Sequence, residues 1–186
     1  MSLSYWLDQS KAETITKDIV IIGGGIAGLS SAYWLQKTDP TLKIALVEKY
    51  ELGSGATGRN AGFITCGSVE HFNRLVGKHG KDEALEIWKF SEDNLKYLKE
   101  EIIQDQADQL FFENRGSFSL ASKETEFSEL KDSADLMTEL GVNVEVLGAG
   151  DIKSRTGGEG FVGGVKYLDD ASIHPIKLLH QIKKRI

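Results

Sequence analysis

Hydrophobic residues near the start of the chain change period twice, from strand to helix and back. The apolar run Ile19–Ile22 is short enough for a buried parallel strand. After three glycines, apolar residues recur at helical spacing until Asp39-Pro40 ends the pattern. Leu42–Val47 then has the character of a second strand, so the segment predicts a βαβ unit. The residues expected on one face of its helix are Ile26, Leu29, Ala32 and Tyr33.

The rest of the chain continues to alternate between helical and strand periods. Residues 69–104 have a helical period, and Val142, Val144 and Val146 alternate with polar residues as in a half-buried strand. This mixture predicts an α/β protein in which a Rossmann-like βαβ unit precedes a mixed α+β region. Strand-like character is expected over 110–121, with Asn114-Arg115-Gly116 as a turn signal within it, and a further strand over 165–168. Further helices are expected through Phe127, Leu130, Ala134 and Met137, ending near Gly141, and from His174-Pro175 onwards.

The three glycines between the first strand and its helix match the spacing G-x-G-x-x-G. Gly23 permits a tight turn, Gly25 lets the backbone lie against a pyrophosphate, and Gly28 lets the helix pack closely on the sheet. The N–H groups at the start of the helix then face the phosphates. Glu48 ends the second strand, twenty positions after Gly28, where an acid can accept hydrogen bonds from a ribose. The alternative is a βαβ unit whose glycines serve packing alone.

A second glycine-rich stretch, Tyr50–Ser68, follows the βαβ unit. It is too rich in glycine for a regular element, and loops of this length in compact domains are usually functional or disordered. Its small residues allow the backbone to follow an extended ligand closely. Arg59 supplies a cation for phosphate oxygens, and Thr57 and Asn60 supply neutral hydrogen-bonding groups. The alternative is a solvated surface loop with Arg59 in water.

These motifs together resemble the N-terminal part of the glycine oxidase/D-amino-acid oxidase superfamily of FAD-dependent oxidoreductases. The matching stretches are GGGIAGLSSAYWL, ALVEK and GSGATGRNAGFI, with weaker agreement at ENRGSFSLA and YLDDASIHPIKL, so that the resemblance covers essentially all 186 residues. It implies an enzyme that oxidises C–N bonds of amines or amino acids by hydride transfer to flavin. Because Arg59-Asn60-Ala61 contains no histidine, it also implies a non-covalently bound flavin.

The resemblance places FAD on the first 68 residues. It implies a diphosphate at Gly23–Gly28, an adenosine ribose at Glu48, and the Gly55–Gly62 loop along the pyrophosphate. No residue between 69 and 186 lies in a motif specific enough to be named catalytic. The residues assigned to cofactor binding are Gly23, Gly25, Ile26, Ala27, Gly28, Glu48, Lys49, Gly55, Thr57, Arg59, Asn60, Ala61 and Gly62.

The resemblance also suggests a division of the chain. Residues 1–68 form the FAD-binding region, 69–172 part of a substrate-binding lobe with a helical insert, and 173–186 a helix returning to the FAD region. Members of that family are considerably longer, so the fold is expected to be truncated. Two parallel strands alone make a poor sheet, and unpaired edges invite association. We therefore expect a fragment, or a subunit that self-associates or needs another chain.

Several single residues have a functional and a structural interpretation, and the structural one is favoured for each. Trp88 is expected in the core, His174 at the start of a helix, and Cys66 as a small buried residue. Arg115 and Arg155 could bind a carboxylate but are expected at the surface. Tyr5, Trp6 and Leu7 could hold the lead-in against the domain, and His79 is expected to share an apolar face with Phe72, Leu75 and Val76.

Composition narrows the class of function further. A length of 186 residues, 40% of them hydrophobic, suits a globular protein with one core and a small second lobe. The net charge of −6 argues against nucleic acid as the main partner. A single cysteine excludes an internal disulfide and fits the cytoplasm. No apolar run approaches the roughly 20 residues of a membrane span, and His71 and His79 lack partners at metal-ligand spacing.

Two other classes of function remain open on the sequence. A nicotinamide-dependent dehydrogenase would use the same βαβ fingerprint, and Glu48 suits either ribose. The Gly55–Gly62 loop favours FAD over that alternative. A non-catalytic nucleotide-binding fragment is the second alternative, and it would fold without turning over any amine.

Overall fold

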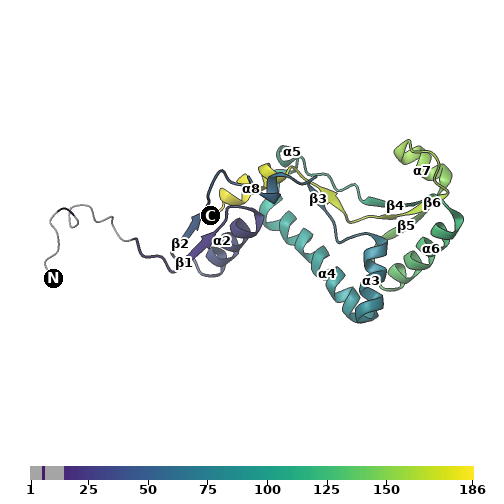
Figure 1. The fold of residues 1–186 in the computed structure, drawn as a ribbon, viewed down its shortest axis with the longest axis horizontal. Helices are drawn as coiled ribbons and strands as arrows, with labels where there is room; N and C mark the ends of the chain where they lie inside the picture. Colours follow the sequence, from purple (N-terminus) through teal and green to yellow (C-terminus); the bar gives the residue numbers. More distant parts are fainter. Residues whose placement is uncertain (1–5, 7–14) are drawn as a thin grey trace.

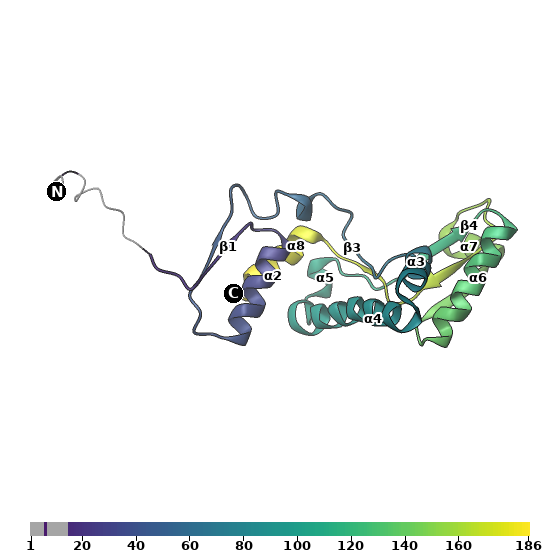
Figure 2. The same cartoon turned by 60° about the horizontal axis from the view of Figure 1, so that its bottom comes forward.

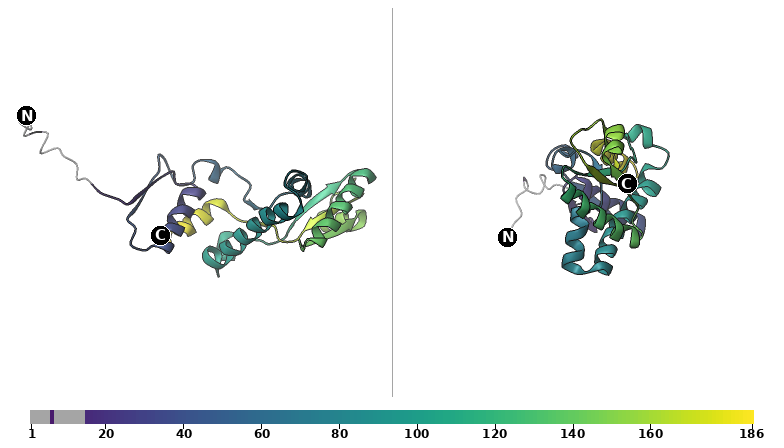
Figure 3. Two further views of the ribbon diagram at one scale, coloured as in Figure 1. Left: turned by 90° about the horizontal axis from the view of Figure 1, so that it is seen from below. Right: turned by 90° about the vertical axis from the view of Figure 1, so that its right-hand side faces the viewer.

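The described residues form an elongated molecule with a group of elements at each end. The computed structural model describes Trp6 and residues 15–186; Tyr5 and Leu7 lie outside them, and Trp6 is exposed. One end holds β1, β2, α2 and α8, and the other holds a three-stranded sheet with α6 and α7 (Figure 1). The long helix α4 lies between the two groups (Figures 2 and 3).

The predicted βαβ unit is confirmed. Strand β1 (Ile19–Ile22) pairs in parallel with β2 (Ile44–Val47), and helix α2 (Ile26–Thr38) connects them. The expectation that β1 is buried is wrong on one face. Val20 is 59% and Ile22 is 88% exposed, because among the described residues β1 pairs with β2 alone and helices cover only the opposite face.

The glycine-rich loop leads from β2 to a second small sheet. It contains one turn of 3₁₀-helix, η1 (Ala56–Gly58), and ends in β3 (Phe63–Ile64). Strand β3 pairs antiparallel with β7 (Ala171–Ser172), which lies more than a hundred residues later in the chain. This pairing fixes the exit of the loop against the C-terminal part of the chain.

The predicted helical region 69–104 consists of three helices. Helix α3 (Val69–His79) begins at Ser68, whose hydroxyl accepts the His71 N–H at 3.2 Å, and Gly80 (φ +83°) separates it from α4 (Lys81–Tyr97). A π-helical segment, η2 (Leu98–Ile103), continues α4. His79 is the last residue of α3 and is exposed, although it lies two turns after Phe72 on the same face of the helix.

The core position predicted for Trp88 is confirmed. Its side chain is 1% exposed and makes edge-to-face contacts with Phe72 and Tyr167, with ring centroids 5.3 and 5.4 Å apart. Met137 and Val165 belong to the same cluster, which joins α3, α4 and α6 (Glu124–Glu139) to the three-stranded sheet. A separate cluster gathers α2, η2 and the last helix around Leu29, Ile102 and Leu179.

The strand expected over 110–121 forms only in its second half. Residues Ala107–Leu110 make the short helix α5, and the strand β4 covers Ser117–Ala121. Phe111 ends α5 in a left-handed conformation (φ +52°), so the apolar run around it cannot continue as a strand. Residue Glu113 then makes an isolated bridge to Ser172.

Strand order in the three-stranded antiparallel sheet is β4-β6-β5. Strands β5 (Val144–Gly148) and β6 (Gly163–Tyr167) match two expected strands, and α7 (Ala149–Thr156) connects them. The predicted alternation in β5 is wrong at its end. Leu147 is buried on the sheet face that α7 covers, whereas Val146 is 44% exposed although its register partner Val165 is fully buried.

The last helix returns to the first. Helix α8 (Pro175–Lys183) packs against α2, and both belong to the cluster around Leu179 (Figure 2). His174 precedes Pro175, and its Nδ1 accepts the Lys177 N–H at 3.4 Å. These contacts agree with the structural role expected of His174 at the start of a helix.

A buried carboxylate, Asp170, joins the small β3–β7 sheet to β4. Its side chain is 3% exposed and accepts hydrogen bonds from the hydroxyls of Thr65 (2.7 Å) and Ser117 (2.6 Å) and from the Cys66 N–H (3.3 Å). Its carbonyl oxygen accepts the Gly116 N–H. Burial raises the pKa of the Asp170 carboxyl above its ordinary value, although these three donors oppose the shift.

The raised pKa of Asp170 gives a pH-dependence of stability. Its contribution to stability is complete below the ordinary carboxyl pKa of about 3.9 and is lost as the pH rises through the folded-state value. We expect Asp170→Asn to gain stability relative to the wild type as the pH rises above about 4, as measured by urea unfolding. Asp132→Asn, which removes the same charge from an exposed position of α6, controls for net charge. A flat or opposite trend for Asp170→Asn alone would contradict the assignment.

Candidate functional site

The turn after β1 has the geometry that its glycines predict. Gly23 has φ +109°, a conformation that side chains disfavour. A Cβ on Gly28 would collide with the Gly23 carbonyl oxygen, so α2 can approach the end of β1 this closely only with glycine at both positions. Gly25 precedes α2 with extended backbone and no side-chain cap, which leaves the start of the helix to be satisfied by other groups.

Thr57 supplies one of those groups from the loop. Its hydroxyl oxygen accepts the Ile26 N–H at 3.0 Å, and a Cβ on Gly25 would lie 3.0 Å from the same oxygen. The loop therefore lies directly on the N-terminus of α2. A hydroxyl that accepts one hydrogen bond keeps its own hydrogen free to donate to an anion.

Glu48 lies at the same edge of the sheet as the glycine turn. Its Oε2 accepts the Gly24 N–H at 2.6 Å and its Oε1 accepts the Tyr50 N–H at 3.0 Å. These backbone hydrogen bonds, that from Tyr50 first, hold the pKa of the Glu48 carboxyl below its usual value. The carboxylate is thus fixed in its charged form beside the turn, with further lone pairs available to accept.

The other residues predicted to bind the cofactor, in the loop and at Lys49 just before it, make different contacts. Asn60 uses its amide within the loop: Nδ2 donates to the Ala56 and Thr57 carbonyls, and Oδ1 accepts the Gly62 N–H at 2.8 Å. Arg59 lines a cavity of about 660 Å³ together with Gly53 and Lys183 of α8. The Lys49 ammonium lies 4.8 Å from the centre of the Tyr50 ring.

A cavity of about 410 Å³ begins at the glycine turn and runs between α2, β3 and the end of α4. No charged residue lines it within the described part of the chain, and aromatic and aliphatic side chains form most of its wall. Such a cavity suits an uncharged, largely apolar group. The residues that connect it to the turn and loop are Ile26, Ser30, Thr57, Asn60 and Gly62.

The described residues give no support for a metal site or for a membrane-spanning helix. Within residues 15–186 and Trp6, no group of three His, Cys, Asp or Glu side chains is placed to hold a metal ion. In the same part of the chain, none of the helices combines the length and the apolar character needed to cross a membrane.

A parallel β-α-β unit with a glycine turn at the helix start and an acid after the second strand defines a dinucleotide-binding protein. Comparison with known families narrows this class of dinucleotide-binding proteins to one family. The model of the DAO family, described as FAD dependent oxidoreductase, matches residues 18–186. The chain belongs to this family of FAD-dependent flavoproteins, and the nicotinamide alternative gains no support.

Individual relatives agree with the family match. The chain is 25% identical over 167 residues to gamma-glutamylputrescine oxidoreductase of Escherichia coli (strain K12), covering 89% of this chain and 38% of that protein. It is 33% identical over 132 residues to mitochondrial L-2-hydroxyglutarate dehydrogenase of Dictyostelium discoideum, covering 70% and 26%. The chain thus spans well under half the length of the relatives it matches.

Solved structures share the fold of the chain. Glycine oxidase from Geobacillus kaustophilus superposes with a TM-score of 0.67 at 22% identity, over 92% of this chain and 44% of that one. The L-alpha-glycerophosphate oxidase from Mycoplasma pneumoniae, solved with FAD bound, gives 0.67 at 19% identity, over 92% and 44%. The predicted α/β fold, corresponding to the N-terminal part of such oxidases, is confirmed.

Sequence reasoning missed two features of this region. The hydrogen bond from the Ile26 N–H to the Thr57 hydroxyl joins residues thirty-one positions apart, so it can be recognised only in the folded structure. The role of Asp170 was also missed, although YLDDASIHPIKL was among the matching stretches. A charged residue between an apolar strand and the small residues Ala171 and Ser172 is the signal that could have indicated a buried carboxylate.

The close contact between Gly25 and Thr57 gives a test of the cofactor site. We expect Gly25→Val to abolish FAD binding, because the added side chain would displace the Thr57 hydroxyl and fill the space in front of the helix start. A fluorescence titration of FAD measures this. Gly77→Ala is the matched control, since its Cβ enters open space on α3. Unchanged FAD affinity in a folded Gly25→Val variant would show that the diphosphate binds elsewhere.

Proposed function

We propose that the protein to which this chain belongs oxidises the C–N bond of an amine or amino acid, using FAD bound to the β1–α2–β2 unit. The observation that supports this most is the glycine turn at the N-terminus of α2 inside a chain that matches the FAD-dependent family along residues 18–186. FAD, when bound, supplies the hydride acceptor for this chemistry. The chain itself supplies binding and orientation.

The diphosphate is assigned to the start of α2 at Ile26, Ala27 and Gly28, in front of Gly23 and Gly25, with the Ala27 and Gly28 N–H groups as donors because the Ile26 N–H donates to Thr57. The dipole of α2 favours an anion there, and the unsubstituted Gly25 leaves room for it. The Thr57 hydroxyl donates to the phosphate while it accepts the Ile26 N–H. Glu48 accepts the ribose hydroxyls, and Lys49 lies beside the adenosine.

We assign the Gly55–Gly62 loop to the part of FAD between the diphosphate and the flavin ring. Gly55, Ala61 and Gly62 allow close approach of the backbone, and Arg59 offers a cation to the phosphates. Asn60 holds the loop in shape through its three amide hydrogen bonds. FAD is expected to bind non-covalently, because Arg59-Asn60-Ala61 offers no histidine for attachment.

The substrate class is assigned by analogy with relatives. Gamma-glutamylputrescine oxidoreductase, sarcosine oxidase subunit beta and glycine oxidase bear names of amines or amino acids. A second candidate is a 2-hydroxy acid, because the identity to L-2-hydroxyglutarate dehydrogenases reaches 51% over 86 residues. We place the amine first, since gamma-glutamylputrescine oxidoreductase aligns over 89% of the chain, whereas the 51% identity to the hydroxyglutarate dehydrogenase covers 44% of it.

Anaerobic reduction of the FAD-loaded protein separates these candidates. It is measured as loss of visible flavin absorbance, with the present chain and with the longest chain that its gene encodes. We expect bleaching by glycine, sarcosine or γ-glutamylputrescine. Bleaching by L-2-hydroxyglutarate alone would support the second candidate. Reduction by NADH only, or by none of these compounds in a flavin-loaded full-length protein, would contradict both.

The division of the chain follows from the same proposal. Residues 1–68 are assigned to the FAD-binding region, 69–172 to part of a substrate lobe and 173–186 to a returning helix, in keeping with the two hydrophobic clusters and the packing of α8 on α2. We further assign the protein to the cytoplasm, with small molecules rather than nucleic acid as partners, because its net charge is −6 and its one cysteine suits a reducing compartment.

We further propose that the exposed face of β1 is covered by another polypeptide, a second copy included. Val20, Ile22 and Val47 expose apolar surface there, and each of the two strands has an unpaired edge. We expect the isolated chain to self-associate, with a mass in light scattering that grows with concentration. Val20→Lys should reduce this growth. A clean monomer across micromolar concentrations would rule self-association out.

A further inference from the structure

Helix α4 carries a second apolar row, apart from the residues that it buries in the core. Ile87, Phe90 and Tyr97 are 41%, 78% and 53% exposed. Their separations of three and seven residues place them along one side of the helix, and the exposed Asn94 stands in the same row. Single exposed apolar side chains are ordinary, but a contiguous row of them marks an interaction surface.

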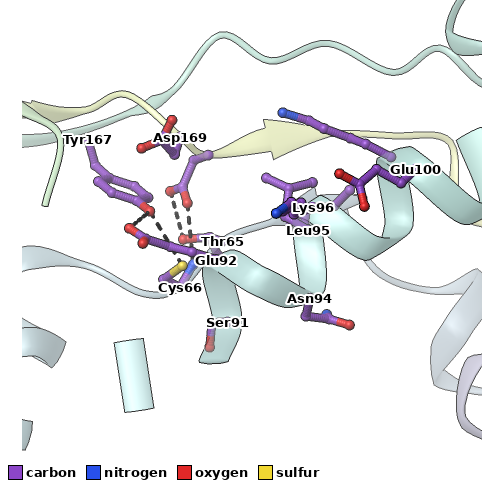
Figure 4. A pocket seen from close by; sticks show the side chains of 13 residues that line it. Thr65, Cys66, Ser91, Glu92, Asn94, Leu95, Lys96, Glu100, Tyr167 and Asp169 are labelled. Atoms are coloured by element: carbon purple, nitrogen blue, oxygen red, sulfur yellow. Dashed lines mark hydrogen bonds between the residues drawn. The ribbon is translucent and has the colours of Figure 1, made fainter. Parts of the chain in front are cut away.

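The opposite side of α4 already has its partners. Trp88 and Leu95 are buried there, and Glu92 Oε1 accepts the Tyr167 hydroxyl at 2.7 Å. Figure 4 shows Glu92 pointing towards Tyr167, whereas Asn94 points away from it. The exposed row is therefore a separate surface of the helix rather than the margin of its buried side.

The row continues from α4 onto α2. Trp34 is 41% exposed and makes an edge-to-face contact with Tyr97, with ring centroids 6.2 Å apart. Trp34, Asn94 and Tyr97 also line the uncharged cavity of about 410 Å³ that begins at the glycine turn. One end of the row thus opens into a pocket with mostly apolar walls, which suits a large apolar side chain. We refer to Ile87, Phe90, Asn94, Tyr97 and Trp34 together as the outer stripe.

Acidic residues border the outer stripe. Each of its apolar members on α4 has an acid four positions earlier, one helical turn away. These pairs are Glu83 with Ile87, Glu86 with Phe90, and Asp93 with Tyr97. The lysines of α4, Lys81, Lys89 and Lys96, stand one, two, or six or more positions from these apolar residues, outside the three- or four-residue spacing of facing side chains. The charge next to the stripe on this helix is therefore negative.

Two of these acids have no partner of opposite charge among the described residues. Glu86 and Asp93 make no ion pair there, whereas the Glu83 carboxylate lies 3.5 Å from His79 Nδ1. Both unpaired carboxylates are exposed, so they remain accessible to a cation from another molecule. Their contribution to binding would weaken as salt screens it.

Lys37 of α2 does not offset these acids. Its ammonium lies 5.1 Å from the centre of the Trp34 ring and is paired with Glu101 of η2. The pocket end of the stripe is thus close to neutral, while its length along α4 is acidic. A partner consequently needs cations along α4 and an apolar side chain at Trp34.

Charge and symmetry restrict what covers the outer stripe. A second copy that meets this face about a two-fold axis would bring the same acidic side of each helix together. An anionic membrane surface would be repelled in the same way. An amphipathic helix with lysine or arginine beside its apolar face complements both the apolar row and the acids.

We propose that the outer stripe docks a basic amphipathic helix of a partner protein. Its apolar face packs on the stripe residues of α4, one large apolar side chain enters the pocket at Trp34, and its basic residues lie beside Glu86 and Asp93. This surface is formed by α4 and α2 and is distinct from the exposed face of β1. The proposal does not depend on the redox function, because it concerns docking alone.

Fluorescence anisotropy with a synthetic peptide tests the proposal. The probe is a labelled leucine–lysine peptide of about 18 residues, long enough to form a helix, with its leucines on one face. The control peptide has the same composition in an order that scatters the leucines around the helix. We expect a Kd on the order of micromolar for the probe and binding at least about tenfold weaker for the control peptide. Both the present chain and the longest chain that its gene encodes should behave in this way.

Two substitutions at exposed positions locate the binding surface. Phe90→Ser should weaken probe binding by about tenfold, because it removes the most exposed apolar side chain of the stripe. Val146→Ser, at an exposed position of β5, is its matched control and should leave binding unchanged. Asp93→Lys should weaken binding several-fold and reduce its dependence on salt. Asp132→Lys, which makes the same charge change on an exposed position of α6, should have a smaller effect.

Three results would each overturn the proposal. The first is equal affinity for the two peptides, and the second is a Phe90→Ser variant that binds the probe as tightly as Val146→Ser does. The third is binding by the present chain that is absent from the longest chain, which would show that further residues of the same protein cover the stripe. Because the readout is peptide binding, the FAD assignment is decided separately.

Discussion

The close approach of helix α2 to the end of strand β1 is the constraint on which the candidate cofactor site depends. The Gly23 carbonyl oxygen occupies the space that a Cβ on Gly28 would need, and Gly23 itself has a left-handed backbone. This geometry places the N-terminus of α2 at the edge of the sheet where Glu48 and the glycine-rich loop also lie. The Thr57 hydroxyl and the Glu48 carboxylate then bind neighbouring N–H groups, so that turn, loop and strand end form one unit.

Away from this unit, the chain is held together by a few long-range contacts rather than by one continuous core. Two hydrophobic clusters lie at opposite ends of α4–η2, one around Leu179 and one around Trp88. Asp170 connects the exit of the glycine-rich loop to β4, and α8 brings the end of the chain back to α2. Among the described residues, the β1–β2 sheet is the part of the fold that exposes apolar side chains on one face and has free edges.

The sequence was most informative where one physical requirement dictates the residue. Glycine spacing and apolar periodicity were enough to predict β1, α2 and β2, and Trp88 was correctly placed in the core. Local pattern failed where distant contacts decide the outcome. The apolar residues around Phe111 resemble a strand, yet Phe111 ends a short helix, and Val146 is exposed although its register partner Val165 is fully buried. The Asp170 and Tyr167 networks join residues up to 105 positions apart, which no local period encodes.

A crystal structure of the protein with FAD bound tests the central claim most directly. The account predicts the diphosphate at the start of α2, against the Ala27 and Gly28 N–H groups and beside Ile26, with the Thr57 hydroxyl donating to it and the adenosine ribose on Glu48. A diphosphate bound elsewhere, for example in the cavity beside Arg59 and Lys183, or a ribose that does not touch Glu48, would contradict it.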